Sequence, residues 1–171
     1  MKPIFNNLLC VFVCLCPLSL NAQWKQIGAD IDGKSDNDKS GYAVSYSSDG
    51  TKVAIGSPNN AGGGLSRGNV SIFQNIDGQW AQIGKNIEGE SDFDQSGWTV
   101  SLSADGKKVA VGSIFNQDNS GRGQVRVYCL KDNDWQQLGE DIDGEDDADN
   151  SGFSISLSAD GRRVADRKSV V

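Results

Sequence analysis

Histidine is absent from the 171 residues of this chain, and cysteine, proline and methionine are scarce. Without histidine, Ser-His-Asp catalysis, Cys-His catalysis and histidine-ligated zinc or iron sites are excluded within these residues. Cys10, Cys14 and Cys16 lie near the N-terminus, and Cys129 is the only other cysteine. The first three lie in an N-terminal segment that we expect to be removed, which leaves Cys129 without an intrachain partner, so we expect stability to come from packing rather than from a disulfide framework.

Basic residues are outnumbered by acidic ones. The chain has 16 Lys and Arg against 23 Asp and Glu, which gives a formal net charge of −7. A surface of this sign repels phosphate backbones and anionic lipid. We therefore expect neither a nucleic acid nor a membrane surface as a partner.

The longest apolar run spans residues 4–20, follows Lys2 and ends near a small residue, Ala22. This pattern is typical of a secretory signal peptide. A membrane anchor is the alternative, but Pro17 interrupts the run, which is short for a bilayer span of about 20 apolar residues. We expect residues 1–22 to be removed and the protein to be secreted or at the cell surface, with no membrane insertion after signal cleavage.

An internal repeat organises the rest of the chain. The stretch that begins at Trp24 recurs at Trp80 and Trp135, so a unit of about 55 residues is repeated. The sequence divides into repeat 1, residues 23–79, repeat 2, residues 80–134, and a partial repeat 3, residues 135–165.

Residues 166–171 break the repeat. Repeat 3 reaches Arg163-Val-Ala, as repeat 2 reaches Lys108-Val-Ala, and then turns into Asp-Arg-Lys-Ser-Val-Val. This hexapeptide resembles the in-frame translation of a short-read sequencing adapter. We therefore predict an adapter-derived tail over residues 166–171 and only part of the natural array in this chain.

Each repeat predicts the same order of strands. Large and small residues alternate over residues 42–46, the period of two that marks a strand. Asp49-Gly50 follows, a pair that favours two-residue hairpin turns. A return strand begins at Val53 and a third strand at Asn69, and the next tryptophan segment can serve as the fourth.

Four antiparallel strands per unit are typical of a β-propeller blade. The predicted fold class is therefore all-β, with β-propeller blades of four antiparallel strands, about 55 residues per repeat, in an incomplete propeller fragment. A β-sandwich and a β-solenoid are alternatives that the long period suits less well. We expect one apolar face of each blade to be buried on its neighbour. The residues predicted to be buried are Tyr42, Val44, Val53, Ile55, Val70, Ile72, Trp98, Val100, Leu102, Val109, Val111, Val125 and Val127.

Three short motifs, Ser40-Gly41-Tyr42, Ser96-Gly97-Trp98 and Ser151-Gly152-Phe153, resemble the Phe-Gly start of FG-GAP repeats. Val53-Ala-Ile-Gly-Ser-Pro resembles the Gly-Ala-Pro strand of the same family. FG-GAP repeats build the propellers of integrin α chains and of many bacterial surface proteins, so the resemblance implies a secreted, integrin-alpha-like β-propeller of bacterial type. One departure is that the family's calcium loop lies between these strands, where residues 47–52 carry a single carboxylate. That metal site does not carry over.

Acidic residues cluster instead in the loop that follows each tryptophan segment. Carboxylates two residues apart in a glycine-containing loop can supply several of the oxygens that calcium needs. The candidate calcium ligands are Asp36, Asp38, Asp92, Asp94, Asp147 and Asp149. The alternative, which we favour, is that these are solvated turn residues that cap their own backbone. We therefore expect no cofactor, with calcium as the candidate.

Repetition favours binding over catalysis, because a catalytic constellation is normally unique whereas stacked units build a surface. Paired carboxylates suited to glycoside hydrolysis are present, but they recur in every repeat. Tyr42, Trp98 and Phe153 could stack on sugars, although their place at the head of an apolar face favours core packing.

We expect a non-enzymatic, secreted or cell-surface β-propeller repeat protein that mediates extracellular binding or adhesion. Its expected partner is an extracellular protein or glycan. The alternative is the non-catalytic propeller portion of a larger secreted enzyme, such as a polysaccharide-degrading one.

Overall fold

The computed structural model describes residues 24–115 and 121–167, and the expected signal peptide lies outside them. In these residues all regular structure is strand, so the all-β prediction is confirmed. Over the same ranges, no helix long and apolar enough to span a membrane is found.

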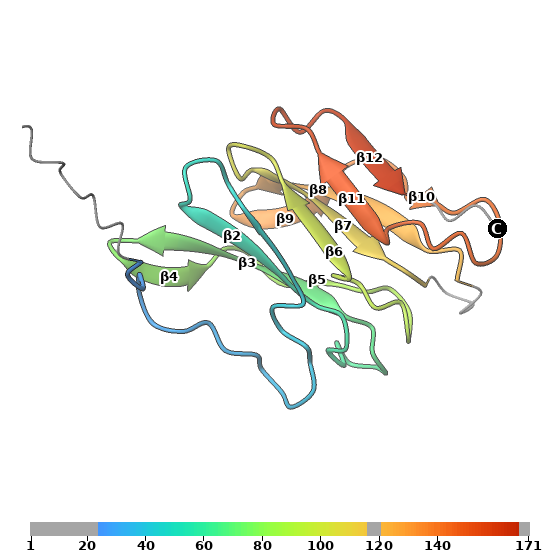
Figure 1. The fold of residues 1–171 in the computed structure, drawn as a ribbon, viewed down its shortest axis with the longest axis horizontal. Helices are drawn as coiled ribbons and strands as arrows, with labels where there is room; N and C mark the ends of the chain where they lie inside the picture. Colours follow the sequence, from blue (N-terminus) through green and yellow to red (C-terminus); the bar gives the residue numbers. More distant parts are fainter. Residues whose placement is uncertain (1–23, 116–120, 168–171) are drawn as a thin grey trace, which may run out of the picture.

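Two antiparallel sheets of the same plan and a final hairpin make up the fold (Figure 1). In the first sheet the strand order is β1-β2-β3-β4, and the short β5 also pairs with β3. In the second sheet the order is β6-β7-β8, and both β9 and β10 pair with β8. The strands are β1 (Ala43–Tyr46), β2 (Lys52–Ser57), β3 (Asn69–Ile76), β4 (Gln79–Gln82), β5 (Ile87–Glu88), β6 (Thr99–Leu102), β7 (Lys108–Ser113), β8 (Gln124–Lys131), β9 (Asp134–Gln137), β10 (Ile142–Asp143), β11 (Ser154–Leu157) and β12 (Val164–Arg167).

The hairpins predicted at the Asp-Gly pairs are present. In each one, the first strand of a unit pairs with the second in the expected register, with Val44 opposite Ile55 and Val100 opposite Val111. The tryptophan segments that follow pair with β3 and β8, as the sequence predicts.

The turns of these hairpins are wider than predicted. The amide of Ser47 donates to the carbonyl of Lys52 at 3.0 Å, which leaves four residues in the loop. Gly50 takes a positive φ of 68° and Asp49 does not. The Asp49 carboxylate instead accepts hydrogen bonds from the hydroxyl of Ser47 and the amide of Thr51, at 2.6 and 2.9 Å. The prediction of a two-residue turn is wrong because Asp49 serves as a cap.

The units stack face to face. We call the face of a sheet that points toward the preceding repeat its leading face and the opposite one its trailing face. A single apolar cluster lies between the trailing face of the first sheet and the leading face of the second. Its residues are Ala54, Val70, Ile72, Ile83 and Ile87 from the first sheet and Val100, Leu102, Val109, Val111, Tyr128 and Trp135 from the second. A smaller cluster joins Ala110 and Val125 of the second sheet to Leu157 of the hairpin.

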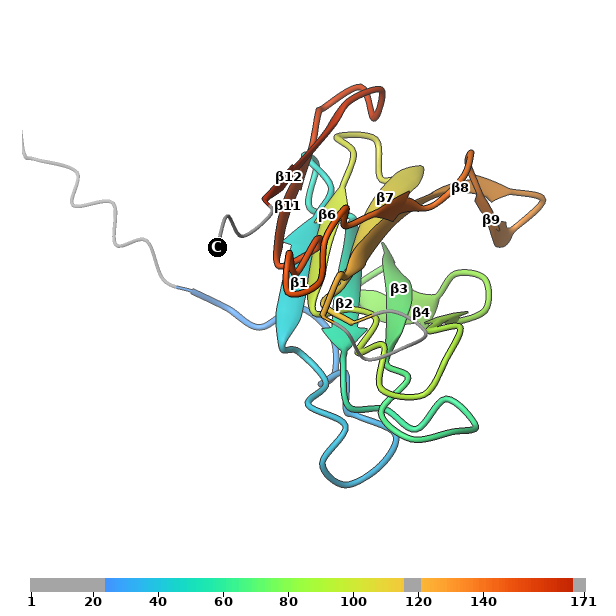
Figure 2. The same ribbon diagram turned by 90° about the vertical axis from the view of Figure 1, so that its right-hand side faces the viewer.

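The first strands of the three units lie next to one another. Strand β1 contacts β6, and β6 contacts β11. Seen from the side, these strands form one flank of the molecule and β9 lies at the opposite flank (Figure 2). Successive units therefore contact each other through their first strands.

The first unit departs from the predicted core. Tyr42 and Val44 are 47% and 59% exposed, whereas Val100 is 9% exposed. The prediction that Tyr42 and Val44 are buried is wrong, because no strand in the described part of the chain covers β1 on this side as β1 covers β6. Trp98 and Val127 are partly buried. The other predicted core residues are buried: Val53, Ile55, Val70, Ile72, Val100, Leu102, Val109, Val111 and Val125.

Sheets and sequence repeats are out of phase. Each sheet takes its outer strand from the tryptophan segment of the next repeat, so the Trp24 segment precedes the first sheet and has no strand of its own. The Trp80 indole donates to the carbonyl of Ile27 at 3.0 Å, and the Trp135 indole donates to that of Ile83 at 3.0 Å. Successive tryptophan segments therefore contact each other in the same way at both steps.

Strand β12 runs into the predicted tail. Asp166 pairs with Ile155, at the position that Val111 holds in the second sheet. Its carboxylate accepts hydrogen bonds from the hydroxyl of Ser151 and the amide of Gly152, at 2.6 and 2.8 Å. Backbone pairing places few demands on side-chain identity, so the adapter origin of residues 166–171 stays a prediction.

Candidate functional site at the loop end

Several repeated features gather at one end of each sheet. The first strand begins there, the second ends there, and the acidic loop passes the start of the third. Gly68 forms a parallel bridge with Ser96, and Gly123 forms the same bridge with Ser151. We call this end, with residues 32–42, 58–69, 88–98, 121–124 and 143–153, the loop end.

The second acid of each candidate calcium pair caps its own loop. Asp38 accepts hydrogen bonds from the amide of Ser35 and the side-chain amide of Asn60, at 3.0 and 2.8 Å. Asp94 accepts from the amides of residues 90 and 91 at 2.9 and 2.8 Å. Asp149 accepts from those of residues 145 and 146 at 2.8 and 3.0 Å. These oxygens are oriented by the backbone, as in Asx turns.

The first acid of the later two pairs is held by an arginine. Asp92 lies 2.8 Å from Arg67, and Asp147 lies 2.9 Å from Arg122. The hydrogen bond from the Arg67 guanidinium, and then one from the backbone of Leu65, lowers the pKa of Asp92. Within residues 24–115 and 121–167, no three acidic or thiol side chains converge on one point as a metal site requires.

The arginine–aspartate pairs were not among the predicted site residues. Both arginines stand directly before the glycine that precedes a third strand, and both aspartates follow them 25 residues later. This repeated spacing is visible in the sequence. Asp36 holds the corresponding position in the first repeat and is exposed.

Three aromatic rings, one per unit, form a row at the loop end. The ring centroids of Tyr42 and Trp98 are 4.7 Å apart, and those of Trp98 and Phe153 are 6.0 Å apart. Tyr42 and Phe153 are 47% and 43% exposed, and Trp98 is partly buried. Lys39 lies 5.8 Å from the Tyr42 ring and Arg167 lies 5.0 Å from the Phe153 ring. The aromatic row thus combines packing with an accessible surface.

A buried arginine distinguishes the second unit from the first. Arg126 is 3% exposed and forms an ion pair with Glu90 at 3.2 Å. Its guanidinium also donates to the carbonyl of Glu88 at 3.1 Å. Because Glu88 lies in β5 of the first sheet and Glu90 closely follows that strand, Arg126 links the two sheets.

The first unit has Ser71 where the second has Arg126. A cavity of about 20 Å³ lies there, and its polar lining includes Asp38, Ser57, Asn69 and Ser71. A space of this size and polarity suits one water molecule. The Arg126 side chain therefore occupies in the second unit the place that the small cavity takes in the first.

Comparison with models of protein families finds no match, and comparison with curated proteins finds none. Among solved structures, the chain resembles "Complex of KlAtg21 with coiled-coil of AgAtg16", whose matched fold is a WD40-type β-propeller. The match has 12% identity and a TM-score of 0.50 and covers 74% of this chain. It spans 36% of the length of that chain. The likeness is one of fold: antiparallel sheets arranged as in part of a propeller.

Proposed function

We propose that this chain belongs to a secreted or cell-surface β-propeller repeat protein whose loop end binds an extracellular protein or glycan. In this proposal β1–β4 and β6–β9 are two four-stranded blades of a propeller that this chain builds in part, with the short β5 and β10 as additional strands. The FG-GAP family remains the proposed relationship, on the motifs at Gly41, Gly97 and Gly152.

The observation that carries the proposal is the aromatic row. Equivalent residues of three units, Tyr42, Trp98 and Phe153, come into contact and keep part of their ring surface open to solvent. Aromatic and arginine side chains are enriched in binding surfaces, because large rigid rings lose little conformational entropy when they are covered. Arg67 and Arg122 at the same end add charge-assisted hydrogen-bonding groups.

Binding can be tested on arrays of immobilised polysaccharides and of extracellular matrix proteins, probed with the labelled chain. We expect a Trp98→Ala variant to lose at least about tenfold in affinity for whichever probe binds, which corresponds to about 1.4 kcal/mol.

Trp24→Ala is the matched control. Trp24 is 99% exposed, so its removal changes neither packing nor the row. Equal loss in both variants, or binding that survives Trp98→Ala in a folded protein, would refute the aromatic row as the site. The class of the bound probe decides between glycan and protein.

A further inference from the structure

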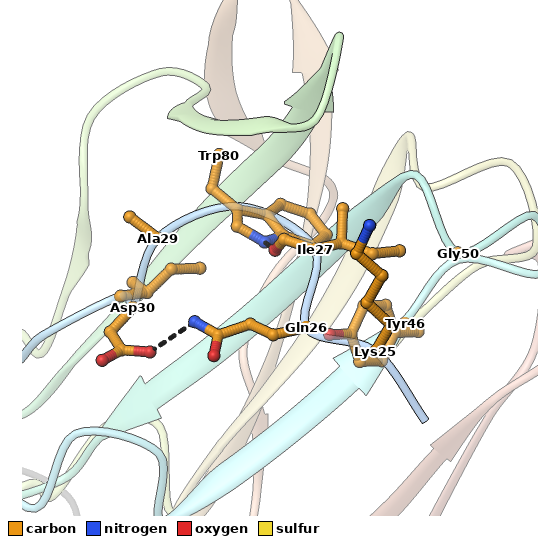
Figure 3. A pocket seen from close by; sticks show the side chains of 9 residues that line it. Lys25, Gln26, Ile27, Ala29, Asp30, Tyr46, Gly50 and Trp80 are labelled. Atoms are coloured by element: carbon orange, nitrogen blue, oxygen red, sulfur yellow. Dashed lines mark hydrogen bonds between the residues drawn. The ribbon is translucent and has the colours of Figure 1, made fainter. Parts of the chain in front are cut away.

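The leading face of the first sheet is open at its first strand, β1, whereas Val53 and Ile55 of β2 on the same face are buried. Val44 and Tyr46 are 59% and 57% exposed. Tyr46 also borders an open pocket of about 470 Å³ with Ile27 and Trp80 (Figure 3). Contiguous exposed apolar side chains, unlike single ones, are typical of a surface that packs against another.

The second unit shows what covers this surface. Val100 and Leu102 hold the positions of Val44 and Tyr46 and are 9% and 7% exposed, because the trailing face of the first sheet lies on them. The contact includes a hydrogen bond from the amide of Leu102 to the hydroxyl of Ser45, at 2.9 Å.

The next step along the array repeats this contact. The amide of Leu157 donates to the hydroxyl of Ser101 at 2.9 Å. The turns are also linked in series, since the amide of Ser48 donates to the carbonyl of Ala104, and the amide of Ala104 donates to that of Ala159, both at 2.9 Å. The same hydrogen bonds therefore recur at both interfaces between successive units of the chain.

The equivalent residues of the third unit are Ser156, which corresponds to Ser45 and Ser101, and Ala159, which corresponds to Ser48 and Ala104. Both are exposed. Ser156 lies on the trailing face of the β11–β12 hairpin. Ala165 is opposite Ser156 and is also exposed. Among the described residues, both halves of the interface are therefore exposed: Val44 and Tyr46 on the first sheet, and Ser156 and Ala165 on the hairpin.

We propose that the trailing face of the β11–β12 hairpin docks on the open leading face of the first sheet of a second copy of this chain. Tyr46 holds the position of Leu102 and Leu157, so the Tyr46 amide of one copy donates to the Ser156 hydroxyl of the other. The Ala165 side of the hairpin covers Val44. This contact joins two different surfaces, so copies associate head to tail and either close into a ring or continue to grow.

The inference goes beyond the proposed extracellular binding and does not rest on it. Sedimentation velocity of the full chain over about a hundredfold concentration range should show mass rising with concentration. Val44→Glu places a charge on the leading face of the first sheet, and Ser156→Arg places one on the trailing face of the hairpin, so each substitution blocks one of the two surfaces. Each variant alone should be monomeric, while an equimolar mixture should form a one-to-one dimer, since one intact interface remains.

Leu65→Glu and Ser35→Arg are matched controls at exposed positions off both surfaces, and they should associate like the unchanged chain. Circular dichroism checks that each variant is folded. A monomeric unchanged chain at every concentration would overturn the proposal. So would a mixture of folded Val44→Glu and Ser156→Arg proteins that stays monomeric.

Discussion

At the scale of single residues, glycines allow the units to approach closely. Gly97 has a φ of 86°, and a Cβ placed on it would lie 2.5 Å from the carbonyl oxygen of Asn69 and 3.1 Å from the Cα of Gly56. Gly41 holds the same repeat position with a φ of 84°, and a Cβ there would have nothing within 4 Å. The two glycines share a backbone conformation but differ in their surroundings.

Alanine at these glycines should separate the two effects. Gly41→Ala should lower the free energy of unfolding by about 1 kcal/mol through backbone strain alone. Gly97→Ala should cost about 2–4 kcal/mol, because overpacking adds to the same strain. Urea denaturation followed by tryptophan fluorescence measures both. Equal losses would mean that the contact between Gly97 and Gly56 relaxes freely.

The aspartates of the Asp-Gly turns have lowered pKa values. The hydroxyl of Ser47, followed by the amide and hydroxyl of Thr51, lowers the pKa of Asp49 from 3.8 to about 2. Bonds from a serine hydroxyl and a turn amide also lower the pKa of Asp105 and that of Asp160. These carboxylates favour the charged form more in the folded chain than in the unfolded one.

Acid should therefore weaken the fold through these turns. Their contribution is complete above the unfolded pKa of 3.8 and is lost as the pH falls toward the folded value of about 2 for Asp49. Urea midpoints measured between about pH 5 and about pH 2 should fall less steeply in an Asp49→Asn, Asp105→Asn, Asp160→Asn protein than in the unchanged chain. Parallel curves would contradict this assignment.

At the scale of elements, the link from β8 to β5 and the residues that follow it depends on Arg126. This guanidinium is 3% exposed, whereas the Glu90 side chain paired with it is 42% exposed. Burial raises the pKa of Tyr128, and the charge of Arg126 beside it opposes that shift. A buried cation is tolerated only while its partners remain.

Removing Glu90 should thus cost more than removing both partners. We expect Glu90→Ala to lower the free energy of unfolding by about 1–2 kcal/mol, less than for a fully buried pair because water reaches the carboxylate. Adding Arg126→Met should recover part of that loss. A double-mutant cycle from urea denaturation measures the coupling, and strictly additive losses would show that the pair contributes nothing.

The same strand position also contributes different amounts to stability in different units. Val44 in β1 and Val100 in β6 are equivalent, but only Val100 is covered by a neighbouring sheet. We expect Val100→Ala to cost about 1–2 kcal/mol and Val44→Ala less than about 0.5 kcal/mol. Dilute protein in urea denaturation provides the comparison. Similar costs would indicate that Val44 is also buried in solution.

At the scale of the whole molecule, the acidic loops raise the question of calcium. Three acids cap their own loops and two pair with arginines, so calcium would have to displace bonds that already orient these oxygens. We expect the melting midpoint to be the same with millimolar calcium as with a chelator. A rise with calcium would establish a site, and Asp94→Asn should then abolish it.

Much of the local structure could be predicted from the sequence alone. Period-two alternation at residues 42–46 and 98–102, and the Asp-Gly pairs after them, identify hairpins because strand alternation and turn chemistry depend on near neighbours. The repeat at Trp80 and Trp135 also identifies the outer strands. The width of the turns was missed, because side-chain capping by Asp49 competes with the tighter turn.

The tertiary structure alone decided which faces are covered and which charges meet. Val44 and Val100 look alike in sequence, but their burial depends on whether a second sheet lies against them. The pairing of Arg67 with Asp92 follows from the pairing of β3 with β5 in the first sheet, and the burial of Arg126 follows from the stacking of the two sheets. Local propensity is a property of a segment, whereas burial and ion pairing are properties of two surfaces brought together, and only the fold brings them together.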